Sequence, residues 1–159
     1  MYYFAYGPNM NLADFGNWCE LRKVRHLRIF TKQPAILRDF KLVFDHYSSD
    51  FQCGIANLRP TPGEMVEGVI FNISDEDLWI IKKKNGVPGI YEEHVDPVTV
   101  YQYDETPVRP IKFFTIPEER CKPDLKPSKA YLQIIIDGAK AEKLHPEYIA
   151  KLQSIPTQD

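Results

Sequence analysis

The sequence predicts a mixed α+β fold in which strands predominate and the helices come late. Three observations predict it. Several segments rich in β-branched and aromatic residues are separated by short polar turns, which is typical of strands. Later segments instead repeat apolar residues at helical spacing. The chain has 159 residues and no repeat or linker that divides it, so we expect one domain over residues 1–159.

The first half of the chain predicts strands. Residues 2–6 are aromatic or small, as in a buried strand, and the turn residues Gly7-Pro8-Asn9 end it. Residues 24–44 contain two apolar stretches around Pro34, which predict a strand, a loop and a second strand. Residues 65–73 predict a further strand.

The first predicted helix begins at Ser74. Ser74 and Asp77 have the spacing of a capping box, with a hydroxyl at the cap and an acid three residues later. The helix then runs through residues 78–81 into three lysines, whose charge suits the last turn of a helix. Asn85-Gly86 is a typical helix end.

The second half alternates between strands and helices. Residues 90–103 and 108–116 are rich in Val, Ile, Tyr and Phe, and they predict two strands. Ser128 is expected to begin a helix, and Pro146 lies near the start of a last, short one. Apolar or small residues of the Ser128 helix recur on one face, at Tyr131, Ile134, Ile135 and Gly138.

The composition excludes several classes of protein. A formal net charge of −2 gives no electrostatic basis for binding nucleic acid. No apolar run reaches the roughly 18 residues of a membrane span. The three cysteines are odd in number and far apart, and the first residues lack a leader pattern, so we expect no disulfide framework and a cytoplasmic location. The histidines have no metal-ligand spacing with the cysteines, so no metal is expected.

The N-terminal strand and turn form the strongest candidate binding element. A strand that runs into a Gly-Asn turn exposes backbone amides, which can hold an anionic group. The sequence also contains nine Tyr, nine Phe and two Trp, which suit strands and can line a ligand pocket. The alternative interpretation is a core strand followed by an ordinary tight turn.

The order of the residues adds a resemblance. Residues 2–11, Tyr-Tyr-Phe-Ala-Tyr-Gly-Pro-Asn-Met-Asn, resemble the Y-F-A-Y-G-S-N opening of the γ-glutamylcyclotransferases, the AIG2-like family, with Pro8 where the family has Ser. Further blocks resemble this family in the same order along nearly the whole chain. They are residues 35–44, 54–56, 67–71, 127–131, 138–140 and 145–155.

The resemblance implies a fold and a reaction. The fold is a small mixed β-barrel flanked by helices, with a cavity at one end and the N-terminal loop as one wall. The reaction is an intramolecular aminolysis, in which the α-amine of a γ-glutamyl group attacks its own γ-carbonyl. It releases 5-oxoproline and an amine or amino acid, as in glutathione metabolism. Because the substrate tethers its own nucleophile, the site needs neither metal nor cofactor.

Two positions depart from the family pattern. Asn85 stands where the family has the Glu that moves the protons, and Ile81-Lys82 replace a Leu-Asp pair before it. Pro8 removes one hydroxyl and one backbone N–H relative to Ser. Anchoring of a carboxylate would then fall to the amides of Gly7, Asn9 and Met10 and to the Asn9 side chain.

The resemblance also assigns the candidate site residues. The catalytic position is Asn85, and the alternative for this residue is a plain helix cap. Glu67 is a possible substitute acid because it interrupts an apolar strand, and the alternative is a solvated surface position. The lysine run before Asn85 is either a solvated helix end or an attractor of anions. The predicted substrate-binding residues are Tyr3, Phe4, Ala5, Tyr6, Gly7, Pro8, Asn9, Met10 and Tyr131, of which Tyr131 also fits a buried helix face.

Two functional hypotheses follow. The chain is either a cyclotransferase that acts on γ-glutamyl amines or γ-glutamyl amino acids with a relocated acid, or a catalytically degenerate protein that senses or sequesters a small anionic metabolite. Both predict a small anionic partner, such as a γ-glutamyl compound, and neither predicts binding to nucleic acid or to a membrane. A monomer and a homodimer are both compatible with the sequence.

Overall fold

The computed structural model describes residues 1–159 and has a mixed α+β architecture, as the sequence predicted. An antiparallel sheet of five strands in the order β1-β3-β2-β5-β6 forms its centre. Its strands are β1 (Tyr2–Ala5), β2 (Ile29–Ser48), β3 (Cys53–Ile73), β5 (Val100–Gln102) and β6 (Pro107–Val108). A separate pair joins β4 (Glu92–Glu93) to β7 (Phe114–Thr115).

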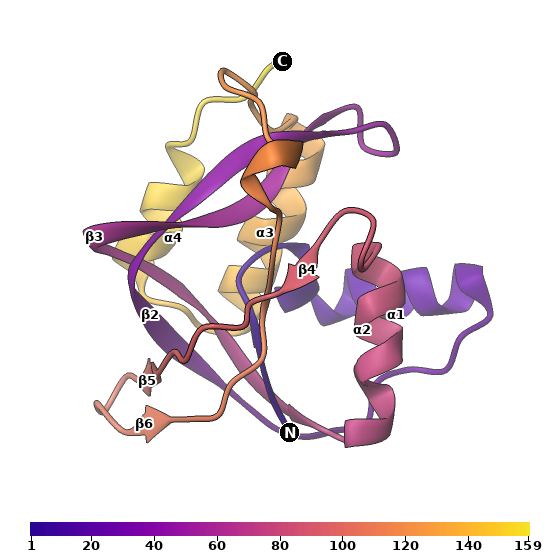
Figure 1. The fold of residues 1–159 in the computed structure, drawn as a ribbon, viewed down its shortest axis with the longest axis vertical. Coiled ribbons are helices and arrows are strands. Elements are labelled where there is room, and N and C mark those ends of the chain that lie inside the picture. The colour runs from indigo at the N-terminus through magenta and orange to yellow at the C-terminus, as the bar shows by residue number, and fades with distance from the viewer.

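The long hairpin of β2 and β3 curls the sheet (Figure 1). Its register shifts at three places, between residues 29 and 31, 38 and 40, and 43 and 46. Irregularities of this kind bend a strand and increase its twist. The hairpin therefore wraps partly around the core.

The sheet is not closed, and the expected β-barrel is wrong in this respect. The strands β1 and β6 form its two edges. After β6 the backbone pairs with β1 only through the isolated parallel bridge between Tyr3 and Lys112. One bridge does not form a ladder, so a curled open sheet results rather than a barrel.

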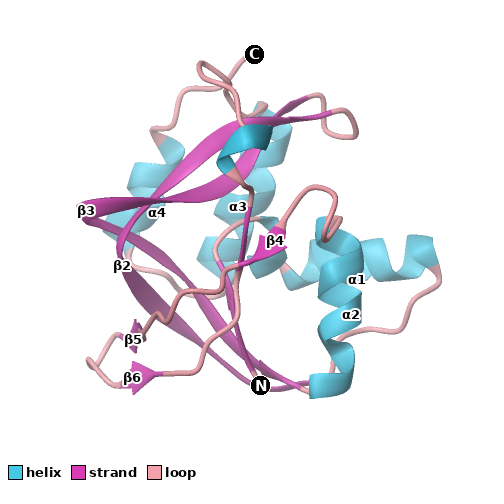
Figure 2. Ribbon diagram, viewed as in Figure 1, coloured by secondary structure: helices cyan, strands magenta, loops and turns pink.

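Four helices surround the sheet (Figure 2). Figure 1 shows α3 and α4 beside the curled hairpin, with α1 and α2 on the opposite side of the N-terminal strand. The short 3-10 helix η1 (Pro8–Met10) connects β1 to α1 and packs against α3. The helices are α1 (Leu12–Arg22), α2 (Leu78–Asn85), α3 (Lys129–Ala141) and α4 (Pro146–Gln153), with further 3-10 turns η2 (Asp75–Asp77) and η3 (Glu118–Arg120). None of the helices combines the length and apolar character that a bilayer crossing requires.

The helix α1 was not predicted. Six of its eleven residues are apolar, but they do not all lie on one face of the helix. Its start is instead determined locally. The Asn11 side chain accepts a hydrogen bond from the Asp14 amide at 3.0 Å, as an N-cap does. Lys23 then ends the helix in a left-handed conformation.

The loop expected at Pro34 is also absent. Pro34 lies within β2 and pairs with Val69 of β3. On its other side, β2 pairs with β5 only from Ala35 to Leu37. Pro34 therefore stands just beyond that ladder, where the missing N–H breaks no pairing.

The capping box expected at Ser74 does not form, although the helix does. The Ser74 side chain makes no capping hydrogen bond. Asp77 is instead fully buried and forms ion pairs with Arg25 and Arg28, and its carboxylate also accepts from the Arg28 amide at 2.6 Å. The acid thus attaches the segment before β2 to the start of α2.

The helix ends in the second half were predicted better than the strands. Ser128 caps α3 by accepting from the Tyr131 amide at 3.1 Å, and Gly86 ends α2 in a left-handed conformation with φ of 65°. The strands expected over residues 90–103 and 108–116 shrink to short pieces, β4 to β7. The intervening stretches are loops that pass beside the sheet.

Candidate functional site

A cavity of about 100 Å³ opens where the end of β1, the turn η1, the end of α2 and the start of α3 meet. Most of its lining comes from segments that are far apart in the sequence. The lining residues are Tyr3, Tyr6, Gly7, Pro8, Asn9, Ser48, Asp50, Phe51, Ile55, Ala56, Lys84, Asn85, Ile90, Tyr91 and Tyr131.

The buried side chain of Asn9 organises one wall of the cavity. Its Nδ2 group donates to the Tyr3 hydroxyl at 2.9 Å and to Asn85 Oδ1 at 3.0 Å. Its Oδ1 accepts from Lys84 Nζ at 2.8 Å. Both N–H groups of the amide and its carbonyl are therefore engaged. Asn9 thereby joins β1, η1 and the end of α2.

The close approach of α3 holds η1 in place. A Cβ atom on Gly138 of α3 would lie only 2.8 Å from the backbone nitrogen of Asn11 and 3.0 Å from the carbonyl carbon of Met10. Only glycine permits this contact. The helix also accepts a hydrogen bond there, from Asn11 Nδ2 to the Ile134 carbonyl at 3.0 Å.

Lys84 and Asn85 bring polar groups from the last turn of α2 to the cavity. The Lys84 ammonium lies 5.2 Å from the centre of the Phe15 ring, a cation–π contact with α1. Burial lowers the pKa of Lys84 from its usual value, and the nearby Asp14 partly opposes this shift. Asn85 uses its carbonyl oxygen on Asn9, and its Nδ2 group makes no hydrogen bond within the chain.

Two tyrosines hold the opposite wall. The amide of Ala56 on β3 donates to the Tyr131 hydroxyl at 3.0 Å, and the Tyr91 hydroxyl donates to the Ala56 carbonyl. Phe51 meets the Tyr131 ring edge-on, with 4.9 Å between centroids. Burial raises the pKa of both tyrosines well above the usual value, so both are neutral donors or acceptors.

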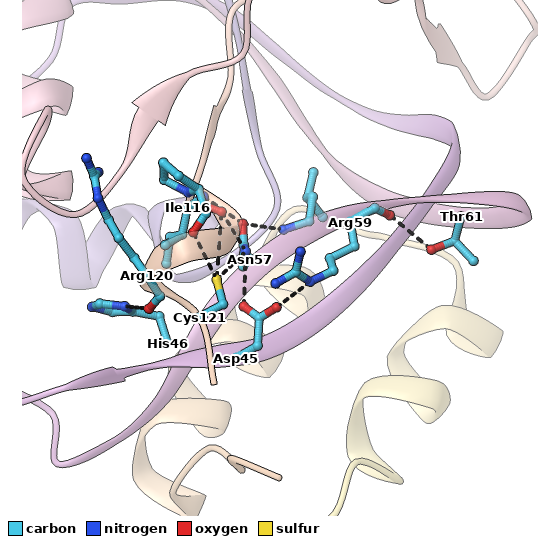
Figure 3. Close-up of polar contacts among 10 residues, drawn as sticks. Asp45, His46, Asn57, Arg59, Thr61, Ile116, Arg120 and Cys121 are labelled. Atoms are coloured by element: carbon cyan, nitrogen blue, oxygen red, sulfur yellow. Dashed lines mark hydrogen bonds and ion pairs between the residues drawn. The ribbon is translucent and has the colours of Figure 1, made fainter. Parts of the chain in front are cut away.

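Arg120 fixes the loop that carries Tyr91. Its guanidinium donates to the carbonyls of Pro88 and Ile90, at 2.8 and 2.9 Å. Its own carbonyl lies 2.7 Å from His46 Nδ1 on β2. Figure 3 shows this contact beside the hydrogen bonds of Asn57. The loop is thus tied to the sheet through Arg120.

The buried Asn57 of β3 secures the same region (Figure 3). Its Oδ1 accepts from the amides of Leu58 and Ile116, each at 2.8 Å. Its Nδ2 donates to Asp45 Oδ1 at 3.0 Å, and Asp45 also pairs with Arg59. This satisfied network holds the segment before η3 against the sheet.

The cavity lining is rich in hydrogen-bond donors. The backbone amides of Gly7 and Asn9 make no hydrogen bond within the chain, whereas the Met10 amide is used on the Gly7 carbonyl at 3.0 Å. Burial raises the pKa of Tyr3 to about 12, so its hydroxyl keeps a proton to donate. Lys84 is the one cation of the lining, and the exposed Asp50 is its one carboxylate.

The predicted site residues separate into two groups. Tyr3, Tyr6, Gly7, Pro8, Asn9, Asn85 and Tyr131 line the cavity. Phe4, Ala5 and Met10 do not line it, and all three are buried in the core. Alternation along β1 explains the difference for Phe4, because successive side chains of a strand point to opposite faces.

Glu67 lies outside the cavity lining, although it is buried. Its carboxylate accepts from the Tyr103 hydroxyl, from the His145 amide at 3.2 Å and contacts His145 Nδ1 at 2.9 Å. It therefore contacts the residue that precedes α4, away from Asn85.

Several lining residues were not singled out in the sequence. Asp50, Phe51, Ala56 and Tyr91 reach the cavity only through the curl of the sheet and the loop after α2. Lys84 had a signal, since it precedes Asn85 in the lysine run, but a solvated helix end gives the same pattern. Its contacts with Asn9 and Phe15 distinguish the two interpretations.

The fold and cavity define a class of proteins, in which a curled sheet and an N-terminal strand-turn enclose a small polar site. The sequence model of the AIG2-like family matches residues 65–152. The gamma-glutamylcyclotransferase of Bos taurus is 30% identical over 162 residues, covering 99% of this chain and 79% of the relative. The Homo sapiens gamma-glutamylcyclotransferase is 30% identical over 169 residues, with 99% and 79% covered.

The comparison with solved structures points to the same family as the sequence comparison. A solved structure named gamma-glutamyl cyclotransferase superimposes with a TM-score of 0.84 at 27% identity, covering 100% of this chain and 89% of the other. The chain belongs to the AIG2-like family and is γ-glutamylcyclotransferase-like in sequence and fold.

Proposed function

We propose that this chain binds a small carboxylate-bearing metabolite in the cavity and does not efficiently turn over γ-glutamyl compounds. The observation that carries the proposal is Asn85. The resemblance places Asn85 at the position of the family Glu, and its side-chain oxygen accepts a hydrogen bond from Asn9 at 3.0 Å.

The chemistry of cyclisation explains why this residue matters. The α-ammonium of a γ-glutamyl group must lose a proton before it attacks, and the leaving amine must gain one. A carboxylate does both steps, whereas a side-chain amide has no titratable proton. Loss of such an acid–base group typically lowers a rate by about 10²–10⁴.

The hydrogen-bond donors that have no partner within the chain, or that keep free N–H groups, support binding. Gly7 and Asn9 offer backbone amides, Asn85 offers Nδ2, and Lys84 offers a charged group. A cluster of main-chain amides with a neighbouring cation favours an anion. Tyr131 and Tyr91 keep the opposite wall fixed through Ala56, so the cavity is largely preformed.

A second candidate is slow cyclotransferase activity, and Asp50 favours it. Asp50 is the only carboxylate of the lining. It lies in the turn between β2 and β3 and lines the same cavity as Gly7 and Asn85. In this case Asp50 would accept the proton.

The experiment measures product and binding on the same protein. Purified protein is incubated with γ-glutamyl-alanine, and 5-oxoproline is quantified by mass spectrometry against a protein-free control. The melting temperature is measured with a set of small carboxylates. We expect no release above the uncatalysed level and a raised melting temperature with at least one carboxylate.

Two results would decide against the proposal. Release of 5-oxoproline that Asp50→Asn lowers would favour the second candidate. The absence of any melting shift and of any heat of binding across the carboxylates would contradict the binding role.

A further inference from the structure

The wall beside Asn85 carries a positive charge that forms no ion pair with a carboxylate. Lys84 Nζ has one hydrogen-bond partner, Asn9 Oδ1 at 2.8 Å, and forms no salt bridge. An ammonium group has three donors, so two make no hydrogen bond within the chain. Lys84 lines the cavity, and its ammonium group also lies 5.2 Å from the centre of the Phe15 ring.

The charge of Lys84 determines which ligand charges are favourable at this wall of the cavity. A Glu at position 85 would attract the α-ammonium of a γ-glutamyl group. With Asn85 and Lys84 together, the wall instead presents an amide N–H and an ammonium group. Because like charges a few ångströms apart repel, an α-ammonium group at this wall is disfavoured.

The ligand that fits has a carboxylate and no ammonium. In 5-oxoproline the nitrogen belongs to a neutral lactam, and the carboxylate is the only charge. In a γ-glutamyl compound the same nitrogen is a cation at neutral pH. The two molecules thus differ in the charge of the nitrogen that would lie near the Lys84 ammonium group.

We propose that the cavity selects small carboxylates that carry no ammonium group, with 5-oxoproline as the smallest probe, and that Lys84 is the specificity-determining residue. This inference rests on the proposed binding function and names its ligand class. Neither Asp14 nor Asp50 forms an ion pair with Lys84. Asp14 lies in the first turn of α1 without pairing with it, and Asp50 is exposed in the turn between β2 and β3.

A matched pair of ligands tests the selection. N-Glutaryl-alanine and γ-glutamyl-alanine are identical except that the first lacks the α-amino group. Isothermal titration calorimetry measures both, together with 5-oxoproline, on the full chain. We expect 5-oxoproline to bind and N-glutaryl-alanine to bind at least about tenfold more tightly than γ-glutamyl-alanine.

Variants then test the residue. Lys84→Met should remove most of the preference between the two ligands, and Lys84→Gln should do so while keeping a polar group near Asn9. Lys83→Met is the matched control, because Lys83 is exposed on the same helix turn and does not line the cavity. It should retain the preference. A circular dichroism melt checks that each variant is folded.

The outcomes separate the two proposals. If none of the three ligands binds the wild-type chain, the binding function itself is wrong, and the selection with it. If γ-glutamyl-alanine binds as tightly as N-glutaryl-alanine or more tightly, the binding function stands and the selection is overturned. If the folded Lys84 variants keep the preference, Lys84 is not its source.

Discussion

Replacing Asn85 by Glu should restore proton transfer to the cavity. The change lengthens the side chain by one methylene group and adds a titratable carboxylate. Asn9 Nδ2 already donates to Asn85 Oδ1 at 3.0 Å, so it is placed to donate to a carboxylate there. The end of α2 is unaffected, because Gly86 and not Asn85 adopts the left-handed conformation.

The size of the gain follows from the neighbours. A general acid–base group contributes about 10²–10⁴ in rate, with the best effect when its pKa lies near the working pH. Here the Lys84 ammonium and the Asn9 amide both favour the charged carboxylate and make it a weaker base. We therefore expect Asn85→Glu to raise 5-oxoproline release by roughly 10², at the lower end of this range.

The assay is release of 5-oxoproline from γ-glutamyl-alanine under conditions of low substrate, so that kcat/KM is measured. Asn85→Gln is the control, since it has the length of Glu and no titratable proton, and it should stay at the wild-type level. Adding Pro8→Ser to Asn85→Glu should raise the rate further, because it returns a hydroxyl and an N–H to the turn. A folded Asn85→Glu protein with no gain over Asn85→Gln would refute the reasoning.

Three further changes test the parts of the fold that hold the site. Asp77→Asn should lower the free energy of unfolding at pH 7 by about 1–3 kcal/mol, because the arginine pair loses its buried partner. Burial alone would raise the pKa of Asp77, but the contacts with Arg25 and Arg28 outweigh it and hold the pKa below its usual 3.8. This stabilisation is therefore present above that pH and lost as the pH falls below it. When the free energy of unfolding is measured at decreasing pH, the values of the wild-type protein and of Asp77→Asn should converge in acid. Tyr131→Phe removes the acceptor of the buried Ala56 amide and should cost about 1–3 kcal/mol in a urea melt. Gly138→Ala forces a Cβ to within 2.8 Å of the Asn11 nitrogen and should cost about 1–3 kcal/mol and weaken ligand binding, whereas an unchanged melting temperature would contradict the close contact.

Local signals in the sequence predicted the elements whose structure depends on local chemistry. Ser128 predicted the start of α3, since a cap depends on a hydroxyl and the amides that follow it. Asn85-Gly86 predicted the end of α2 for a similar reason. Ser74 and Asp77 had the spacing of a cap, but Asp77 binds two arginines from a distant segment instead. A short motif cannot reveal this competition between a local and a tertiary partner.

Prediction of the sheet was limited for a different reason. The strand β2 continues through Pro34 because the neighbouring strand β5 ends before it would need a hydrogen bond from position 34. The residues around Pro34 do not reveal how long β5 is. The barrel inferred from the resemblance is an open sheet, because one bridge at Lys112 replaces the last ladder.

The sequence by itself determined the family and the position of the N-terminal turn, and it predicted that Asn85 replaces a carboxylate, because these depend on residue identity and order. Only the tertiary structure decided what surrounds Asn85. It brings Asn9 from η1 and Lys84 from α2 into one hydrogen-bonded wall, and it leaves Glu67 with His145 outside that wall. The physical reason is that burial and pairing set the charge of a site, and both depend on segments that meet only when the chain folds.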